Sequence, residues 1–251
     1  MNMMKKTFCI IITIMAGAMV AAAGMEPVDY VNTLVGTQSS FELSTGNTYP
    51  AIAMPWGMNC WVPQTGKNGD GWQYTYGANK IRGFKLTHQP SPWINDYGVF
   101  SLMPTVGELM FDENERASWF SHKAETATPY YYKVYLADYD VTAEIAPTER
   151  AAILRFTFPK TDQANIVIDA FDQWSVVRID PEQHAVWGYS TRNSGGVPKG
   201  FKNFFIIKFD KPFTSFSVVE DSIFHNGEKG IGCSHAGAIV TFKTQRGEQI
   251  N

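Results

Sequence analysis

The chain has 251 residues, of which 44% are hydrophobic and 18% are charged, so it can form one large domain or two small ones and is too apolar for wholesale disorder. Its formal net charge at pH 7 is −3, and the sequence contains no run or stripe of basic residues. Nucleic acids and anionic membranes are therefore excluded as expected partners.

The first 24 residues have the pattern of a secretory signal peptide. Two lysines precede an apolar core over residues 7–20, which is too short for a comfortable membrane span. Three alanines end at Ala23, and we expect cleavage near Ala23 or Gly24. The mature domain would then cover residues 25–251. We expect it to be exported to the periplasm or the cell exterior, with no membrane span.

Beyond this leader, short runs rich in β-branched and aromatic residues alternate with polar turns. Residues 130–136 and 139–145 are two such runs separated by Ala137 and Asp138, which predicts a β-hairpin. The other runs are residues 98–111, 151–158, 165–170, 185–191, 203–209, 213–219 and 238–242. Short strands at this spacing, with little helical periodicity, predict an all-β sandwich and not a parallel α/β sheet.

The segment over residues 36–97 is rich in Gly, Pro, Trp, Asn and Thr and poor in alternation, so we expect it to be largely irregular. It contains Trp56, Trp61, Trp72 and Trp93, four of the seven tryptophans. Flat aromatic rings suit the apolar face of a sugar, although core packing is the alternative for any one of them. Because long irregular segments in compact domains are usually functional loops, we expect a binding site here.

Two cysteines remain after the leader, Cys60 and Cys233. An oxidising compartment would permit a disulfide between them, and two buried free thiols are the alternative. No Cys or His spacing is typical of a zinc site. The acidic residues include Asp70, Asp96, Glu108, Asp112 and Asp169, and none lies in a pattern that separates it from surface charge. The sequence therefore predicts no catalytic carboxylate pair and no metal site within this chain.

Several short motifs follow one another along the chain in a specific order. They are YVNTLVGT at 30–37, NTYPA at 47–51, MPWGM at 54–58, GWQY at 71–74, IRGFKLTH at 81–88, QPSPWINDYG at 89–98, RASWFSH at 116–122 and TERAA at 148–152. Each motif alone is weak, but their order and spacing resemble glycoside hydrolase family 92, the calcium-dependent exo-α-mannosidases. The likeness extends from about Asp29 to the end of the sequence.

The resemblance implies a β-supersandwich of the galactose mutarotase-like type, which the family pairs with a C-terminal (α/α)6 barrel. Those enzymes invert configuration with a Glu general acid, an Asp general base and a calcium ion, all carried by the barrel. Calcium is thus expected for the full-length enzyme, with its ligands outside this chain. The expected partners are the barrel and mannose-containing glycans. The family adds a strand after the region of residues 238–247, so this sandwich could be one strand short.

The same resemblance places the loop with Trp93 and Asp96 at the mannose-binding mouth. Trp93 would offer an apolar platform, and Asp96 would accept hydrogen bonds from two vicinal hydroxyls. The alternative is a Trp that packs its own loop beside an Asp in an Asx-turn.

The remaining candidate substrate-binding residues are Trp56, Gly57, Met58, Trp72 and His88. Gly57 would let the backbone approach a ligand, or it could belong to a tight turn between two buried neighbours. Trp72 could line the rim of the site or pack inside the sandwich. His88 could donate to a sugar hydroxyl, although a lone histidine is more often structural.

Two other interpretations of the chain stay open. It could be a stand-alone carbohydrate-binding module, with an affinity of about 1 mM or roughly −4 kcal/mol because half a pocket gives few contacts. It could also be an inactive fragment, whose exposed strand edge would make it poorly soluble.

Overall fold

The computed structural model describes residues 26–38, 48–67, 73–87, 100–193 and 195–251. The chain divides into two compact units, Met1–Val31 and Asn32–Asn251. In the first unit, the 3-10 helix η1 (Pro27–Tyr30) begins at a proline and has a capping box between Glu26 and Asp29. Within the described residues, no helix is long and apolar enough to span a bilayer.

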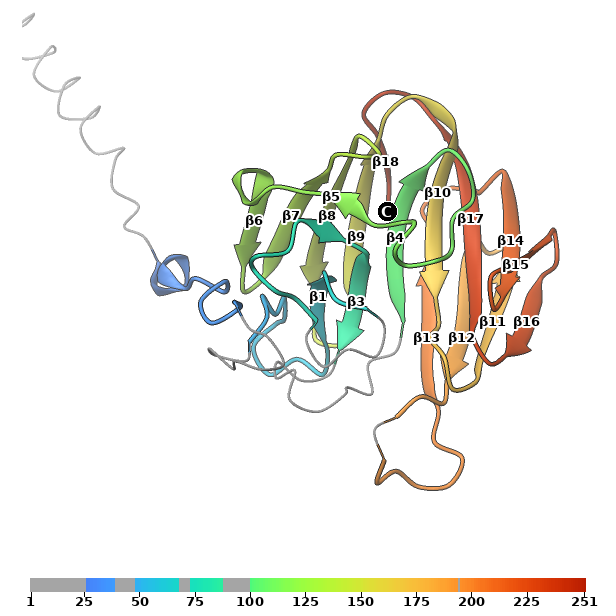
Figure 1. Cartoon of the computed structure of the whole chain (residues 1–251), viewed down its shortest axis with the longest axis horizontal. Helices are drawn as coiled ribbons and strands as arrows, with labels where there is room; N and C mark the ends of the chain where they lie inside the picture. The colour runs from blue at the N-terminus through green and yellow to red at the C-terminus, as the bar shows by residue number, and fades with distance from the viewer. Residues whose placement is uncertain (1–25, 39–47, 68–72, 88–99, 194) are drawn as a thin grey trace, which may run out of the picture. The chain divides into compact units, whose positions relative to one another are not determined.

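The described strands of the second unit form four antiparallel sheets (Figure 1). Their orders are β1-β3-β4-β10-β17-β14-β15, β18-β9-β8-β7-β6, β13-β12-β11-β16 and β2-β5. The elements are β1 (Cys60–Gln64), β2 (Lys80–Ile81), β3 (Gly83–Thr87), β4 (Ser101–Val106), β5 (Ser118–Trp119), η2 (His122–Ala124), β6 (Glu125–Thr128), β7 (Tyr131–Leu136), β8 (Val141–Pro147), β9 (Ala152–Phe158), β10 (Thr161–Asp169), β11 (Ser175–Asp180), β12 (Ala185–Ser190), β13 (Asn203–Lys208), β14 (Ser215–Glu220), β15 (Ile223–Asn226), β16 (Gly230–Cys233), β17 (Ala236–Thr244) and β18 (Glu248–Ile250).

The seven-stranded sheet forms one layer of a sandwich, and the five- and four-stranded sheets form the other. β8 of the five-stranded sheet contacts β1 and β4, whereas β11 and β16 of the four-stranded sheet contact β17. β7 and β8 alternate buried and more exposed residues, as expected for strands with one face on the core. Residues 164–169 of β10 are all buried, because this strand lies at the centre of the sheet with both faces covered.

This architecture confirms the all-β sandwich prediction. The predicted hairpin is present as β7 and β8, which pair from Tyr132 opposite Ile145 to Leu136 opposite Val141. Each of the other predicted runs overlaps a strand. A further strand, β18, follows β17 and pairs with the last three residues of β9.

The prediction that residues 36–97 are largely irregular was wrong in part, because β1, β2 and β3 lie there. Four of the five residues in β1 and four of the five in β3 are buried, so neither strand shows the alternation that marks a half-exposed strand. Trp61 belongs to β1 and is 4% exposed, which makes it a core residue.

Cys60 and Cys233 are both free thiols, of which Cys233 is buried and Cys60 half-buried. Burial raises the pKa of each thiol. Both groups therefore favour the protonated form and are poor nucleophiles.

Candidate functional site

Several connections between strands meet at one end of the seven-stranded sheet. Cys60 lies opposite Thr87, and Asp169 lies between Ser101 and Gly237 in the strand register. β1, β4 and β17 therefore begin at this end, while β3 and β10 finish there. We call it the Asp169 end. Its described connections are residues 54–59, 170–174, 221–222 and 234–235, and Thr87 and Phe100 also lie at this end.

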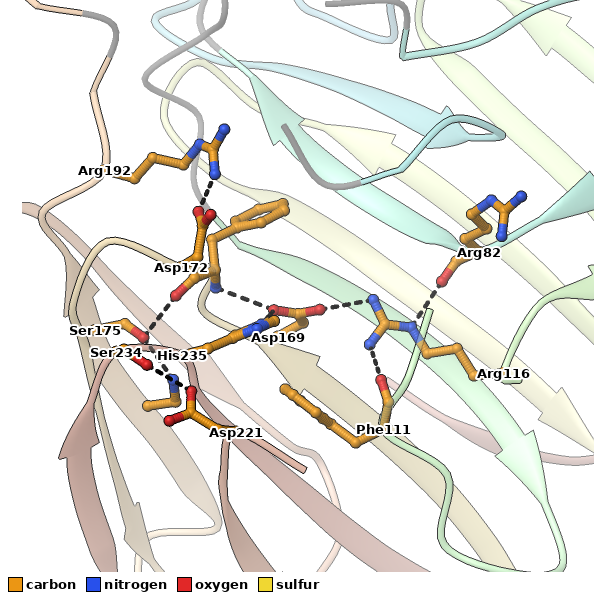
Figure 2. A network of polar contacts seen from close by, with 12 residues as sticks. Arg82, Phe111, Arg116, Asp169, Asp172, Ser175, Arg192, Asp221, Ser234 and His235 are labelled. Carbon is orange, nitrogen blue, oxygen red and sulfur yellow. Dashed lines mark hydrogen bonds and ion pairs between the residues drawn. The ribbon is translucent and has the colours of Figure 1, made fainter. Parts of the chain in front are cut away.

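A buried ion pair between Arg116 and Asp169 lies at the centre of this end (Figure 2). The Arg116 Nη2 atom is 2.8 Å from the Asp169 Oδ2 atom, and the two side chains are 0% and 2% exposed. Arg116 also donates to the backbone carbonyls of Arg82 and Phe111, at 3.0 and 2.6 Å. Because buried charges are tolerated only when paired and hydrogen-bonded, this arrangement fixes the segment containing Arg116 against the sheet.

The other carboxylate oxygen of Asp169 binds His235 and the backbone of Phe171. The His235 Nε2 atom lies 2.7 Å from Asp169 Oδ1, and the Phe171 N–H donates to the same oxygen at 3.0 Å. Burial alone would raise the pKa of Asp169, but the Arg116 charge and the His235 hydrogen bond outweigh it and hold this pKa well below its ordinary value. Asp169 is therefore ionised at neutral pH and cannot serve as a general acid.

His235 has the opposite shift. Burial would lower its pKa, but the hydrogen bond to Asp169 and the charge of Asp169 outweigh burial and raise it. Its stabilising contribution is then complete below the unfolded pKa of about 6.5 and is lost as the pH rises through the folded pKa.

Replacing His235 with Gln should therefore destabilise the chain more at about pH 5.5 than at about pH 9. At the lower pH we expect a loss of about 1.5–3 kcal/mol, because a charge-assisted hydrogen bond is removed. Denaturant unfolding of the parent and the variant at both pH values measures the difference. A loss that is equal at the two pH values, or larger at pH 9, would show that His235 is not charged in the folded state.

The connection after β10 is held by a second set of polar contacts, also drawn in Figure 2. Asp172 pairs with Arg192, and Ser175 Oγ donates to the Phe171 carbonyl at 2.8 Å. The Ala236 N–H donates to Ser175 Oγ at 2.7 Å, which joins this connection to the start of β17. The loop after β10 is thus tied both to Arg192 and to the start of β17.

Backbone strain is concentrated at the same end. Among the described residues, eight non-glycine residues have positive φ, and six of them belong to the Asp169 end. They are Trp56, Phe171, Gln173, Trp174, Asp221 and Ser222. Such conformations cost roughly 1–3 kcal/mol each and cluster at functional sites. Their concentration here, and not across the fold, motivates a functional hypothesis for this end of the sheet.

Two tryptophans in these connections are exposed. Trp56 is 99% exposed with a φ of 62°, and Trp174 is 53% exposed with a φ of 74°. An exposed Trp contributes little to core packing, so burial does not explain why these two residues adopt a strained left-handed conformation. Each ring offers a flat apolar face to a ligand such as a sugar.

Residues 54–57 form a tight turn, in which the Gly57 N–H donates to the Met54 carbonyl at 2.9 Å. This matches the turn alternative, but the neighbours of Gly57 are exposed and not buried, since Met58 is 69% exposed. A Cβ on Gly57 would lie 3.0 Å from the Met54 carbonyl oxygen, so the turn itself favours glycine. A ligand-contacting role for Trp56, Gly57 and Met58 stays a prediction.

A polar recess of about 260 Å³ lies beside the network. Phe111 provides one wall, and Asp112, Asp172, Ser222 and His235 supply polar groups. Such a lining suits a hydroxyl-rich ligand, because carboxylates and an imidazole can hydrogen-bond to hydroxyls. In the part of the chain that the structure describes, no group of three or more His, Cys, Asp or Glu could hold a metal ion. Calcium binding by the full-length enzyme stays a prediction.

Trp72, His88, Trp93 and Asp96 lie outside the described residues. Their predicted contacts with sugar stay predictions. The two residues that flank the segment with Trp93 are Thr87 and Phe100, and both are at the Asp169 end.

The sequence did not separate Asp169 from ordinary surface charge, whereas the structure buries it and pairs it with Arg116 and His235. The available signal was its position at the end of the apolar run 165–170, where a charge must be buried with its neighbours. Trp174 was not among the candidate residues predicted from the sequence, because no pattern in its neighbouring residues indicates an exposed side chain.

Comparison with known families identifies the chain. It matches the glycosyl hydrolase family 92 N-terminal domain over residues 30–251 and belongs to this family. Comparison with curated protein sequences gives no match.

Similarity to solved structures agrees with this family assignment. The family GH92 inverting mannosidase BT2199 from Bacteroides thetaiotaomicron VPI-5482 is 42% identical with a TM-score of 0.85, and the match covers 90% of this chain and 31% of that one. The family GH92 α-mannosidase BT3965 from Bacteroides thetaiotaomicron is 28% identical with a TM-score of 0.77, over 92% of this chain and 33% of that one. The structure of BT3965 in complex with mannoimidazole is likewise similar, with 28% identity, a TM-score of 0.75 and coverage of 89% and 31%. The chain thus spans about a third of the length of these mannosidases.

Proposed function

We propose that this chain is the N-terminal substrate-contacting domain of an exported exo-α-mannosidase, and that its Asp169 end faces the bound glycan. The observation that carries the proposal is the meeting of exposed Trp56 and Trp174 with both flanks of the 88–99 segment at one sheet end. The strained backbone and the polar recess at that end support it.

In this proposal the chain binds and orients sugar but performs no proton transfer. Asp169 is unsuited to acid catalysis because it is buried and held ionised. The rest of the enzyme would supply the carboxylate pair of an inverting glycosidase and the calcium ion, which would contact the mannose. Export to the periplasm or the cell exterior is proposed from the first 24 residues.

Calorimetric titration of the chain with mannobiose tests the binding part of the proposal. We expect a dissociation constant of about 1 mM, and the Trp56→Ala variant should bind about 3- to 10-fold more weakly because a stacking platform is lost. Since Trp56 is 99% exposed, the melting temperature should not change.

Trp119→Ala is the matched control. Trp119 is 47% exposed but belongs to β5 in the two-stranded sheet, so its loss should leave mannobiose binding intact. Flat titration heats with the parent chain at mM concentration, or equal losses in the two variants, would refute sugar contact by Trp56.

A further inference from the structure

A polar recess of about 650 Å³ opens on the seven-stranded sheet away from the Asp169 end, and we call it the Asn165 recess. Asn165 lines it and precedes Asp169 by four positions on β10, so the two side chains lie on the same face of the sheet. At about 3.3 Å per residue, they are about 13 Å apart along the strand. The recess is therefore distinct from the one beside Asp169, and its volume is typical of ligand pockets, which are about 300–1,000 Å³.

A row of polar side chains crosses four neighbouring strands at this recess (Figure 1). On β10, Asn165 lies opposite Thr105 of β4 on one side and opposite Thr241 of β17 on the other. Thr241 in turn lies opposite Ser215 of β14. Thr105 and Asn165 are 0% exposed and Thr241 is 8% exposed, so most of the row is buried. Because burying polar groups costs free energy unless they are hydrogen-bonded, core packing does not explain this row.

The hydrogen bonds within the row leave part of it unsatisfied. Thr241 Oγ1 donates to Asn165 Oδ1 at 2.8 Å, and Asn165 Nδ2 donates to the Gly107 carbonyl at 2.9 Å. Because the Thr241 hydrogen points at Asn165, the lone pairs of Thr241 Oγ1 can accept a hydrogen bond from a ligand. In the part of the chain that the structure describes, the Thr105 hydroxyl is buried without a partner. The row thus has more hydrogen-bonding capacity than the chain itself uses.

The rest of the lining is neutral and chemically mixed. Gln163 and Asn226 supply amides, and Leu109, which is 37% exposed, supplies an apolar wall. Among the described lining residues Asp162 alone is charged, and its carboxylate is 2.8 Å from Lys243 Nζ. A charged ligand would find no unpaired counter-charge in this lining, whereas a neutral sugar ring combines hydroxyls for the amides with an apolar face for the wall. The lining therefore selects a neutral, hydroxyl-rich ligand.

We propose that the Asn165 recess binds one neutral hexose unit of a glycan. The sugar donates a hydroxyl hydrogen to Thr241 Oγ1, exchanges hydrogen bonds with Ser215 and the two amides, and packs a C–H face on Leu109. The site goes beyond the proposed function, because its own lining selects the ligand and it is separate from the Asp169 end. It holds one branch of a glycan while the Asp169 end contacts another.

The test titrates the ¹⁵N-labelled chain with methyl α-mannopyranoside up to about 200 mM and follows the amide resonances. We expect saturable shifts in residues 107–109, 215–217 and 226–227, with a dissociation constant of about 10–30 mM. Binding is weaker than at the Asp169 end, because no tryptophan lines the described part of this recess. Shifts that stay linear in sugar concentration, or none in these residues at about 200 mM, would overturn the proposal.

Ser215→Trp and Thr126→Trp give this titration its contrast. Ser215 is exposed at the start of β14, so a tryptophan there fills the recess and should weaken binding by about tenfold or more. Thr126 is exposed on β6 of the five-stranded sheet, so the same change there should leave binding intact. Equal affinities of these two variants for the glycoside would count against the recess as its site.

Asn226→Trp blocks the same recess from the neighbouring strand β15, where Asn226 is exposed, and does not depend on the folding of Ser215→Trp. We expect a similar loss of binding, and full affinity in this variant would overturn the proposal. Mannose 6-phosphate should bind at the recess several-fold more weakly than the neutral glycoside, because the described lining offers a carboxylate and no cation. Tighter binding of the phosphorylated sugar would refute a neutral ligand.

The positions of the shifts separate this proposal from the proposed function. Sugar-dependent shifts in residues 54–59 and 170–174 without any at the recess would overturn only the recess proposal. Shifts at the recess alone would overturn only the assignment of the Asp169 end.

Discussion

Replacing Arg116 with Met should destabilise the chain by about 3–5 kcal/mol. The substitution leaves the Asp169 carboxylate buried without its counter-charge, and breaking one side of a buried pair costs this much. It also leaves the carbonyls of Arg82 and Phe111 without their donor. For a domain of this size, the melting temperature should fall by roughly 6–20 °C.

Two further variants give this experiment its contrast. Lys243→Met breaks an ion pair with Asp162 whose side chains are 64% and 76% exposed, and the melting temperature should stay unchanged. Combining Arg116→Met with Asp169→Leu should recover part of the loss, because no buried charge then remains. A loss for Arg116→Met no greater than that for Lys243→Met would contradict the buried-pair interpretation.

Gly188→Ala should cost about 3 kcal/mol through overpacking in the four-stranded sheet. A Cβ at Gly188 would overlap the Val176 carbonyl oxygen on the neighbouring strand β11 and lie 3.1 Å from the Phe205 ring on β13. A backbone oxygen within a ladder cannot move aside as a side chain can. Thermal unfolding should show a fall of roughly 6–12 °C.

Gly200→Ala is the matched control for this substitution. Gly200 has a φ of +83° and open space where a Cβ would lie, so its replacement costs only backbone strain of about 1 kcal/mol. If both alanine variants lose the same stability, the close approach at Gly188 is not what constrains that position.

Much of the fold was predictable because its strands carry local signals. β7 and β8 alternate buried and exposed residues, and a polar turn separates them. The hydrophobic period and the turn residues therefore both predict a hairpin. β1 and β3 lacked this signal because both of their faces are covered, and a buried strand amid Gly and Trp resembles a loop. The family motifs in this region could be recognised in the sequence, but the extended backbone of β1 and β3 could not be predicted from it.

The candidate site was harder to predict, because its parts meet only through strand pairing. Arg116, Asp169 and His235 are far apart in the sequence, and the register of β10 against β17 brings two of them together. No sequence pattern near Asp169 predicts which side chains bind its carboxylate. Trp56 was selected from a motif, whereas its full exposure follows from a turn with a left-handed residue.

The most direct test of the central claim follows the mannobiose titration residue by residue, with the amide resonances of the ¹⁵N-labelled chain. The account predicts saturable shifts in residues 54–59, 170–174, 221–222 and 234–235, and little change in the middle of β10 and β17. Shifts confined to other surfaces, or none at about 10 mM mannobiose, would contradict the assignment of the Asp169 end as the sugar-facing surface.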